Sequence, residues 1–353
     1  MTRFILRRLL SSIPVLFGIA VSVFVLARVI PSDPCKATLG ERATKAVCDD
    51  FNRRNGLDRP ILVQLGKYLN QLLHGDFGRS FQLRRPITTL ITERLPTTIE
   101  LAVVALVFAV VVGIPLGVIA ARRRNSLLDA GTMVIANAGI SVPVFVLGLA
   151  LQYVFAVMLK GTFLALPPSG RLSAGLIPKP FYEQWGLPKN GVLDFISNHE
   201  MLNGLLQWNW RVVVDAAQHL VLPAVAVGTI PLAIIARMTR SSLLDVLGHE
   251  YVRTSRAKGL SEFAVVRRHA LRSALLPVVT VTGLSLGGLL GGAILTETVF
   301  GLTGVGKTLA DSITARDYGV VQGFALIVGL AFVLVNLLTD ILYAVFDPRV
   351  RPS

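Results

Sequence analysis

The chain has 353 residues, of which 53% are hydrophobic and 16% charged, and its formal net charge is +14. This composition is too apolar for an ordinary soluble domain and indicates an integral membrane protein. In a soluble protein the excess of Lys and Arg would suggest nucleic acid. Here the basic residues gather in loops beside apolar segments, where anionic lipid headgroups attract them. We therefore expect membrane lipid as a partner and no nucleic acid.

Six segments qualify, or come close to qualifying, as membrane-spanning helices, which need about 20 predominantly apolar residues each. They are residues 9–30, 101–121, 140–159, 220–236, 278–295 and 320–346. The first follows Arg7 and Arg8, and the last precedes Arg349 and Arg351. Because short loops rich in Lys and Arg stay in the cytoplasm, the sequence predicts an all-α polytopic membrane protein with six transmembrane helices and both termini inside.

These spans divide the chain into three parts. Residues 1–30 are the N-terminus and the first transmembrane helix, residues 31–100 are an external subdomain, and residues 101–353 are a five-helix core. The core includes an external loop at 161–218 and a cytoplasmic loop at 238–277.

The external subdomain and the 161–218 loop each contain a short sequence pattern that predicts local structure. In the subdomain, the stretch after Pro60 predicts a short amphipathic helix that Gly75 ends. In the 161–218 loop, Trp208 and Trp210 suit the headgroup level of a membrane. Membrane anchoring would explain these two tryptophans, and so would contact with a substrate or a docking protein.

The two cysteines, Cys35 and Cys48, both lie in the external subdomain. An oxidising compartment would allow them to form a disulfide, and the alternative is two unrelated free thiols. Metal binding is disfavoured because no second pair of ligands accompanies them.

The fifth span carries small and hydroxyl-bearing residues at helical spacing. Its glycines at intervals of four share one helix face, which predicts tight helix packing or the lining of a translocation path; these are Gly283, Gly287 and Gly291. The candidates for lining the path are Thr280, Thr282 and Ser285.

Residues 301–308 read GLTGVGKT, a full match to the loop that cradles phosphate groups in nucleotide-binding proteins. That loop works between a buried strand and a helix, whose N-terminus holds the phosphates. Here it falls between two membrane spans on the predicted external side. We therefore interpret it as a Gly-rich turn with a re-entrant or interfacial segment, and we expect no catalytic residue, metal or other cofactor in this chain.

The most basic segment is the loop at 238–277, which the positive-inside rule places in the cytoplasm. Permease subunits of bacterial binding-protein-dependent ABC importers, in the dipeptide, oligopeptide and nickel group, carry a cytoplasmic loop that resembles its run HEYVRTSRAKGLSEFAVVRRHALRSALLPVVT. Further blocks extend the resemblance, with the first, B-type dipeptide permease subunit as the nearest type: FILRRLL, ERLPTTIELA, GIPLGVIAA, SVPVFVLG, LTETVF, RDYGVVQG and VNLLTDILYAVFDPRVR.

The resemblance implies a role for this loop. In such importers it folds as two helices at an angle, and the short helix docks in a groove of a cytoplasmic ATPase. Gly259 suits the turn between them because glycine tolerates unusual backbone angles. The alternative is a loop whose charges only orient the spans, but that role needs no ordered turn. The residues implied in ATPase coupling are Arg253, Arg256, Ala257, Lys258, Gly259, Leu260 and Ser261.

The resemblance further implies a type I ABC importer permease fold in a bacterial inner membrane. Its implied partners are a second homologous permease subunit, two cytoplasmic ATPase subunits that bind ATP and Mg, and an extracytoplasmic solute-binding protein. The chain would then be no enzyme itself, but part of a complex that imports dipeptides or short peptides by alternating access.

Three other functions stay open at this point. Permeases of the same group carry nickel, haem or glutathione. An ion-coupled secondary transporter would need intramembrane carboxylates, for which Asp340 is the candidate. A nucleotide hydrolase would use the loop at 301–308.

Overall fold

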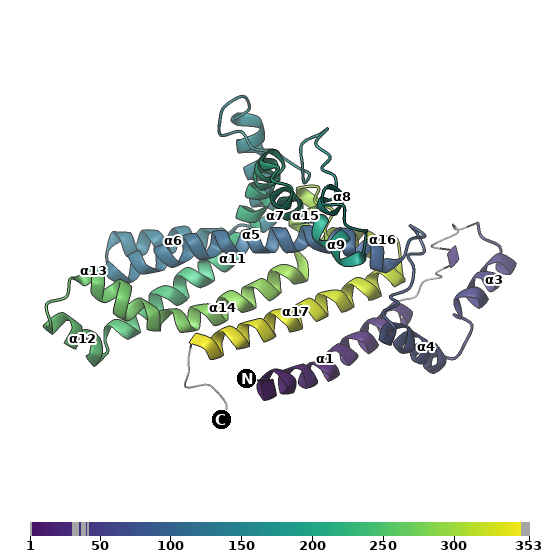
Figure 1. The fold of residues 1–353 in the computed structure, drawn as a ribbon, viewed down its shortest axis with the longest axis horizontal. Helices are drawn as coiled ribbons and strands as arrows, with labels where there is room; N and C mark the ends of the chain where they lie inside the picture. The colour runs from purple at the N-terminus through teal and green to yellow at the C-terminus, as the bar shows by residue number, and fades with distance from the viewer. Residues whose placement is uncertain (1, 30–34, 37–39, 41, 347–353) are drawn as a thin grey trace.

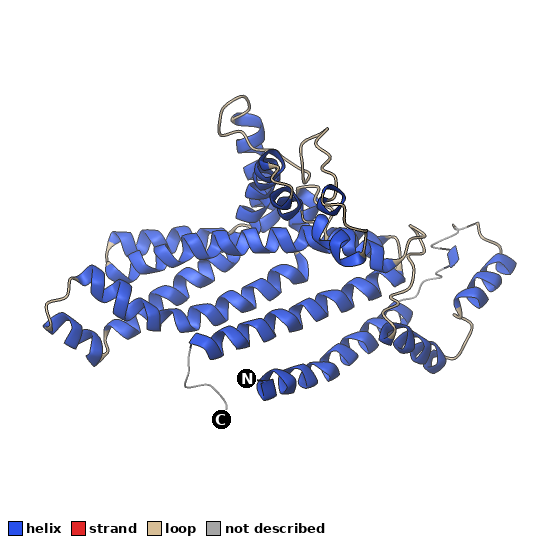
Figure 2. Ribbon diagram, viewed as in Figure 1, coloured by secondary structure: helices blue, strands red, loops and turns tan. Residues whose placement is uncertain are grey.

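The computed structural model describes residues 2–29, 35–36, 40 and 42–346, and Figures 1 and 2 show an elongated assembly of helices. Within these residues the regular elements are helical, and one isolated β-bridge joins Arg79 to Pro86. The all-α prediction is confirmed. Arg349 and Arg351, on which the placement of the C-terminus rested, lie outside the described residues.

Five helical stretches of the described chain are long and apolar enough to cross a membrane. They fall in α1 (Thr2–Val29), α5 (Ile87–Arg122), α11 (Trp210–Leu247), the run of α13 (Glu262–Ala264), η2 (Val265–Ala270) and α14 (Leu271–Gly292), and α17 (Tyr318–Phe346). Several of these helices extend beyond the predicted spans, because helical hydrogen bonding continues past the apolar segment. α5, for example, begins at Ile87, inside the segment 31–100.

The third predicted span, residues 140–159, is not one straight helix. α6 (Leu127–Ser141) begins well before it, and a bend of 100° separates α6 from α7 (Val144–Gln152), which continues as η1 (Tyr153–Met158). The break falls at Val142 and Pro143. Val142 is extended, with φ −93° and ψ 127°, as expected of a residue before proline. The pair counts as a sixth span only if both arms are taken together.

α5 and α11 form the centre of the bundle and pack along their length. A Cβ at Gly113 would lie 2.9 Å from the Leu232 carbonyl oxygen, and one at Gly117 would lie 2.6 Å from the Ala236 carbonyl oxygen. The two backbones therefore approach each other closely, as small residues allow in membrane helices.

α14 packs against α17, and α1 lies beside α17 at the edge of the bundle (Figure 1). Gly283 abuts the side chain of Thr339, and a Cβ at Gly287 would lie 2.8 Å from the ring of Phe332. These two glycines are thus in close contact with α17. Gly291 departs from the predicted packing face, because no atom of the described residues lies within 4 Å of its would-be Cβ.

The N-terminal subdomain consists of short helices at one end of α1. It contains α3 (Lys45–Asn55) and α4 (Ile61–Leu73), and α4 begins after Pro60 as predicted. The chain leaves α4 through Gly75, which has φ +73°. A disulfide joins Cys35 to Cys48, with Cα atoms 5.4 Å apart.

The 161–218 loop folds into α8 (Phe181–Gln184), α9 (Gly191–Ser197) and α10 (Glu200–Leu206) before α11 begins. Arg171 anchors this loop between two carboxylates, at 3.6 Å from Glu100 of α5 and 3.5 Å from Glu200. Trp208 and Trp210 remain 78% and 59% exposed, so their faces are open to lipid or to a partner.

Candidate functional site

The loop at 238–277 contains two helical segments that meet at a sharp turn. α12 (Glu250–Ala257) ends at Lys258, and Gly259 follows with φ +78° and a backbone N–H that donates to the Arg256 carbonyl at 2.9 Å. The hydroxyl of Ser261 then accepts a hydrogen bond from the Ala264 N–H at 3.4 Å and caps the next helical segment. Glycine takes such a φ with the least strain, so the turn explains the glycine.

A bidentate ion pair closes this turn. Arg256 donates from Nε and Nη2 to the two carboxylate oxygens of Glu262, at 3.1 and 2.8 Å. Because both side chains are largely exposed, the pair orients the two helices more than it stabilises them.

One face of α12 is buried against the neighbouring helices. Val252 and Ser255 point inward, and Val252 packs with Val265 and Val266 of η2. Leu243 of α11 and Ala121 of α5 belong to the same apolar cluster. α12 thus contacts η2 and α11 directly, and the cluster continues to α5, so a force on α12 reaches the membrane bundle through packed side chains.

The opposite face of the loop is exposed. It presents all seven residues that the sequence singled out, Arg253, Arg256, Ala257, Lys258, Gly259, Leu260 and Ser261. Beside them Tyr251 and Phe263 are 42% and 59% exposed. Apolar side chains between basic residues suit a partner groove with an acidic rim.

Sequence reasoning missed an ion pair next to this loop. Asp129, in the first turn of α6, accepts two hydrogen bonds of 2.7 Å from Nε and Nη2 of Arg240 on α11. Its N–H contacts the Ser126 hydroxyl at 3.3 Å, which marks a helix start. The run Ser-x-x-Asp at 126–129 signals that helix start, but nothing local identifies Arg240 as its partner.

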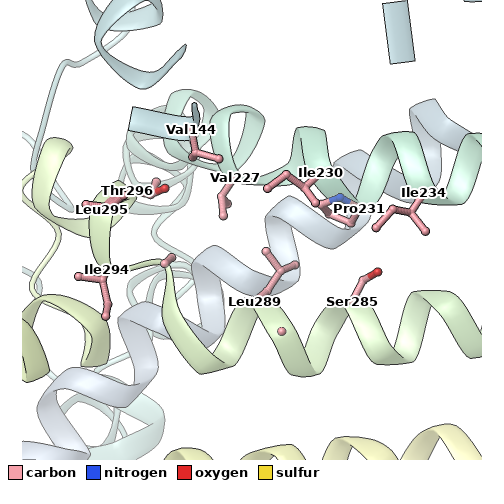
Figure 3. Close-up of a pocket in the computed structure, with 12 residues that line it drawn as sticks. Val144, Val227, Ile230, Pro231, Ile234, Ser285, Leu289, Ile294, Leu295 and Thr296 are labelled. Atoms are coloured by element: carbon pink, nitrogen blue, oxygen red, sulfur yellow. The ribbon is translucent and has the colours of Figure 1, made fainter. Parts of the chain in front are cut away.

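A cavity of about 660 Å³ lies where α7, α11, α14 and α15 (Ile294–Val299) meet. Figure 3 shows Val227, Ile230 and Ile234 of α11 across it from Ser285 and Leu289 of α14. The lining is mostly apolar, and it can accommodate an uncharged or largely desolvated group.

Of the three residues predicted to line a path, Ser285 lines this cavity. Thr282 is not part of the lining, and its hydroxyl donates to the Val278 carbonyl at 2.7 Å within the helix. Thr280 does not line the cavity either. Gly288 takes part in the lining instead, and its would-be Cβ meets no atom within 4 Å in the part of the chain that the structure describes.

The phosphate-loop motif at 301–308 lies between two helices, α15 and α16 (Val305–Thr314). The fully buried Glu297 occupies the N-terminus of α16, where its carboxylate accepts from the Lys307 N–H at 2.8 Å and from the Thr98 hydroxyl at 2.7 Å. A Cβ at Gly304 would collide with this carboxylate. The anion that this helix end attracts is therefore a side chain of the same protein.

Asp340 was the candidate carboxylate for an ion-coupled transporter. It forms an ion pair of 3.2 Å with Arg8 and keeps 32% of its side chain exposed, so it is not a lone buried carboxylate. Among the residues that the structure describes, no group of three or more His, Cys, Asp or Glu could hold a metal ion.

Comparison with known proteins identifies the family of this helical chain. Residues 113–352 match the family described as binding-protein-dependent transport system inner membrane component. Residues 1–102 match the N-terminal region of the membrane component of the same systems. The chain belongs to this family. It is a polytopic α-helical component of the inner membrane, and its family is one of transport permeases.

Three relatives show how far the similarity extends. The chain is 44% identical over 352 residues to the di/tripeptide transport system permease protein DppB of Pseudomonas aeruginosa, covering 99% of both chains. It is 42% identical to the dipeptide transport system permease protein DppB of Alkalihalophilus pseudofirmus, over 99% of this chain and 100% of the relative. The probable D,D-dipeptide transport system permease protein DdpB of Escherichia coli is 41% identical over 95% of this chain and 94% of its own.

Proposed function

We propose that this chain is the transmembrane permease subunit of an ATP-driven importer that moves dipeptides or short peptides across the inner membrane by alternating access. The observation that carries the proposal is similarity over almost the whole chain to permeases named for dipeptides or di/tripeptides. Permeases for nickel, haem or glutathione are the alternatives within the group.

The energy for transport comes, in this proposal, from two cytoplasmic ATPase subunits that hold ATP and Mg. The exposed turn around Gly259 supports this, because it displays basic and apolar side chains outside the bundle while its inner face is packed. This chain contributes no catalytic residue. It contributes a surface on which a partner's movement acts.

Two further partners in this proposal would act at the membrane-spanning helices and outside them. A second homologous permease subunit would complete the pathway, and an extracytoplasmic solute-binding protein would deliver the peptide. The cavity between α11 and α14 supports a path on this side of the bundle, because its wall includes small and apolar residues such as Gly288, Pro231 and Ser285. Rocking of α11 against α14 would change its size.

Uptake of a radiolabelled dipeptide tests this function in cells whose chromosomal copy of the gene is deleted and replaced by a plasmid copy. We expect accumulation that requires ATP and persists when an uncoupler collapses the proton gradient. Accumulation that stops with the gradient and survives ATP depletion would instead show an ion-coupled carrier. Competition by nickel chelates, haem or glutathione distinguishes the alternative substrates.

A matched pair of variants tests the coupling surface. Gly259→Val should abolish ATP-dependent uptake, since a left-handed conformation costs an ordinary residue about 1–2 kcal/mol and a β-branched residue more. Gly259→Asn should retain much of it, because asparagine adopts positive φ readily. Equal uptake by both variants, at equal amounts in the membrane, would contradict the coupling role of the turn.

A further inference from the structure

Two adjoining hollows are lined by α1, α4 and α17. Figure 1 shows α4 beside the end of α1, in the part of the molecule where these hollows lie. The first, which we call the polar cavity, has a volume of about 420 Å³ and is lined by Arg28, Gln64, Lys67, Tyr68 and Gln322 among others. The second, the apolar groove, has a volume of about 440 Å³ and is lined by Phe17, Ala20, Leu72, Leu326 and Leu330 among others.

The hollows form one slot. α1, α4 and α17 each contribute to both, and Phe77 lines both. On α17, Gln322 belongs to the polar cavity and Leu326 to the apolar groove, about 6 Å further along the helix. On α1, Arg28 and Ala20 stand in the same order, about 12 Å apart. The slot is therefore polar at the outer end of these helices and apolar deeper along them.

The polar cavity carries an excess of positive charge. Its lining holds Arg28, Arg54, Lys67 and Arg79 against one carboxylate, Asp76. Arg54 already pairs with Asp50 on α3. Lys67 has neither an ion pair nor a hydrogen bond among the described residues, so its charge is not balanced within that part of the chain.

Arg28 faces neutral groups. Its Nε donates to Gln64 Oε1 at 2.9 Å and its Nη1 to the Phe24 carbonyl at 3.3 Å, while the guanidinium stands 3.6 Å above the Phe24 ring. These contacts hold the side chain in place without neutralising it. An anion in the polar cavity would supply the missing charge.

Two buried groups in the lining also lack partners within the described chain. They are the Tyr68 hydroxyl and the Gln322 side-chain nitrogen, and Gln322 is only 8% exposed. Burial raises the pKa of Tyr68 to about 12, so its hydroxyl keeps a proton to donate. Both groups can donate to the oxygens of an anion, as phosphate and carboxylate groups require.

We propose that this slot binds an anionic phospholipid, with the phosphate near Arg28 and Lys67 and an acyl chain in the apolar groove. A free phosphate would leave the groove empty, and a neutral lipid would leave the charges unbalanced. α1 and α17 are membrane-spanning helices, so the groove is open to a lipid in the bilayer. The lipid fills the junction between α1 and α17 and ties α4 to it.

Native mass spectrometry of the full-length chain, purified in detergent and stripped of lipid, tests this site. The probes are phosphatidylglycerol, phosphatidylcholine with the same acyl chains, and glycerol phosphate. We expect phosphatidylglycerol to bind most tightly. Arg28→Gln and Lys67→Gln should each weaken it about fivefold, as the loss of one basic residue at a charged membrane surface does. The matched control is Arg53→Gln on α3, which does not line the cavity.

The apolar half is tested separately. Leu330→Trp narrows the groove and should weaken binding of phosphatidylglycerol, whereas Leu334→Trp, one turn further along α17 and outside the lining, should not. A photoactivatable diazirine in the acyl chain should label α1 and α17 of the unmodified protein, which keeps the test valid if a variant misfolds.

Three results would overturn the proposal. Glycerol phosphate that binds as tightly as phosphatidylglycerol would reduce the site to one for a free anion. Equal binding of phosphatidylcholine would remove the role of charge. Labelling spread evenly over all spans would show that no particular lipid is held.

Discussion

The ion pair between Asp129 and Arg240 gives a sharp test of how α6 is held against α11. Both carboxylate oxygens of Asp129 accept at 2.7 Å, and Oδ2 also accepts from the Asn125 N–H at 3.0 Å. The Asp129 side chain is 7% exposed and that of Arg240 29%. Asp129→Asn keeps the shape of the side chain, removes its charge and turns one acceptor into a donor that faces the guanidinium.

The expected cost follows from burial. Removing one partner of a buried ion pair lowers the free energy of unfolding by about 3–5 kcal/mol. Because water still reaches part of Arg240 and Asn keeps one acceptor, Asp129→Asn should lower the free energy of unfolding by less than the loss of a fully buried partner would. Adding Arg240→Gln should cost less than the sum of the single changes by about 1–2 kcal/mol, since the two side chains contact each other directly.

Equilibrium unfolding in mixed micelles of detergent and dodecyl sulfate measures these differences. The control is Arg237→Gln on α11, three residues from Arg240 and exposed, which should change the free energy of unfolding by less than about 0.5 kcal/mol. If Asp129→Asn matches that control, or if the two substitutions are additive, the pair does not fasten α6 to α11.

Three further outcomes are expected. Glu297→Gln should lower the free energy of unfolding by about 2–3 kcal/mol in the same assay, because it removes a charged acceptor from the Lys307 N–H and the Thr98 hydroxyl. An unchanged free energy of unfolding would contradict the role of Glu297 at the N-terminus of α16. Cys48→Ser opens a disulfide between residues 13 apart and should destabilise the N-terminal subdomain by about 3 kcal/mol, read as faster limited proteolysis there and not in α11. Glu262→Gln should loosen the turn around Gly259, because it removes the charged partner of Arg256. A spin label at position 260 should report this loss of order as greater mobility than in the unmodified chain.

Local chemistry in the sequence was sufficient to predict several elements of the fold. Apolar length identified the spans, Pro60 and Gly75 bounded α4, and Gly259 marked a turn that needs positive φ. Each of these features depends on a residue's own backbone preference or on transfer into lipid, so neighbours along the chain suffice to reveal it.

Features that depend on distant residues were not predictable. Asp129 and Arg240 are 111 positions apart, and Arg171 meets Glu100 and Glu200 from a loop of no regular pattern. The bend at Pro143 was hidden for a different reason. A proline within an apolar stretch is compatible with a kinked or a broken helix, and only packing decides between them.

The phosphate-loop motif shows why a pattern can be chemically sound and functionally wrong. Unpaired N–H groups at the start of α16 attract an anion, as they do in a nucleotide-binding loop, and the glycines allow a close approach. Here the anion is Glu297, which lies seven residues before Gly304 and outside the motif at 301–308. Since that carboxylate is fully buried between the N-terminus of α16 and Thr98 of α5, a phosphate could enter only by displacing it. The physics that gives the motif its meaning therefore serves here to join α5, α15 and α16.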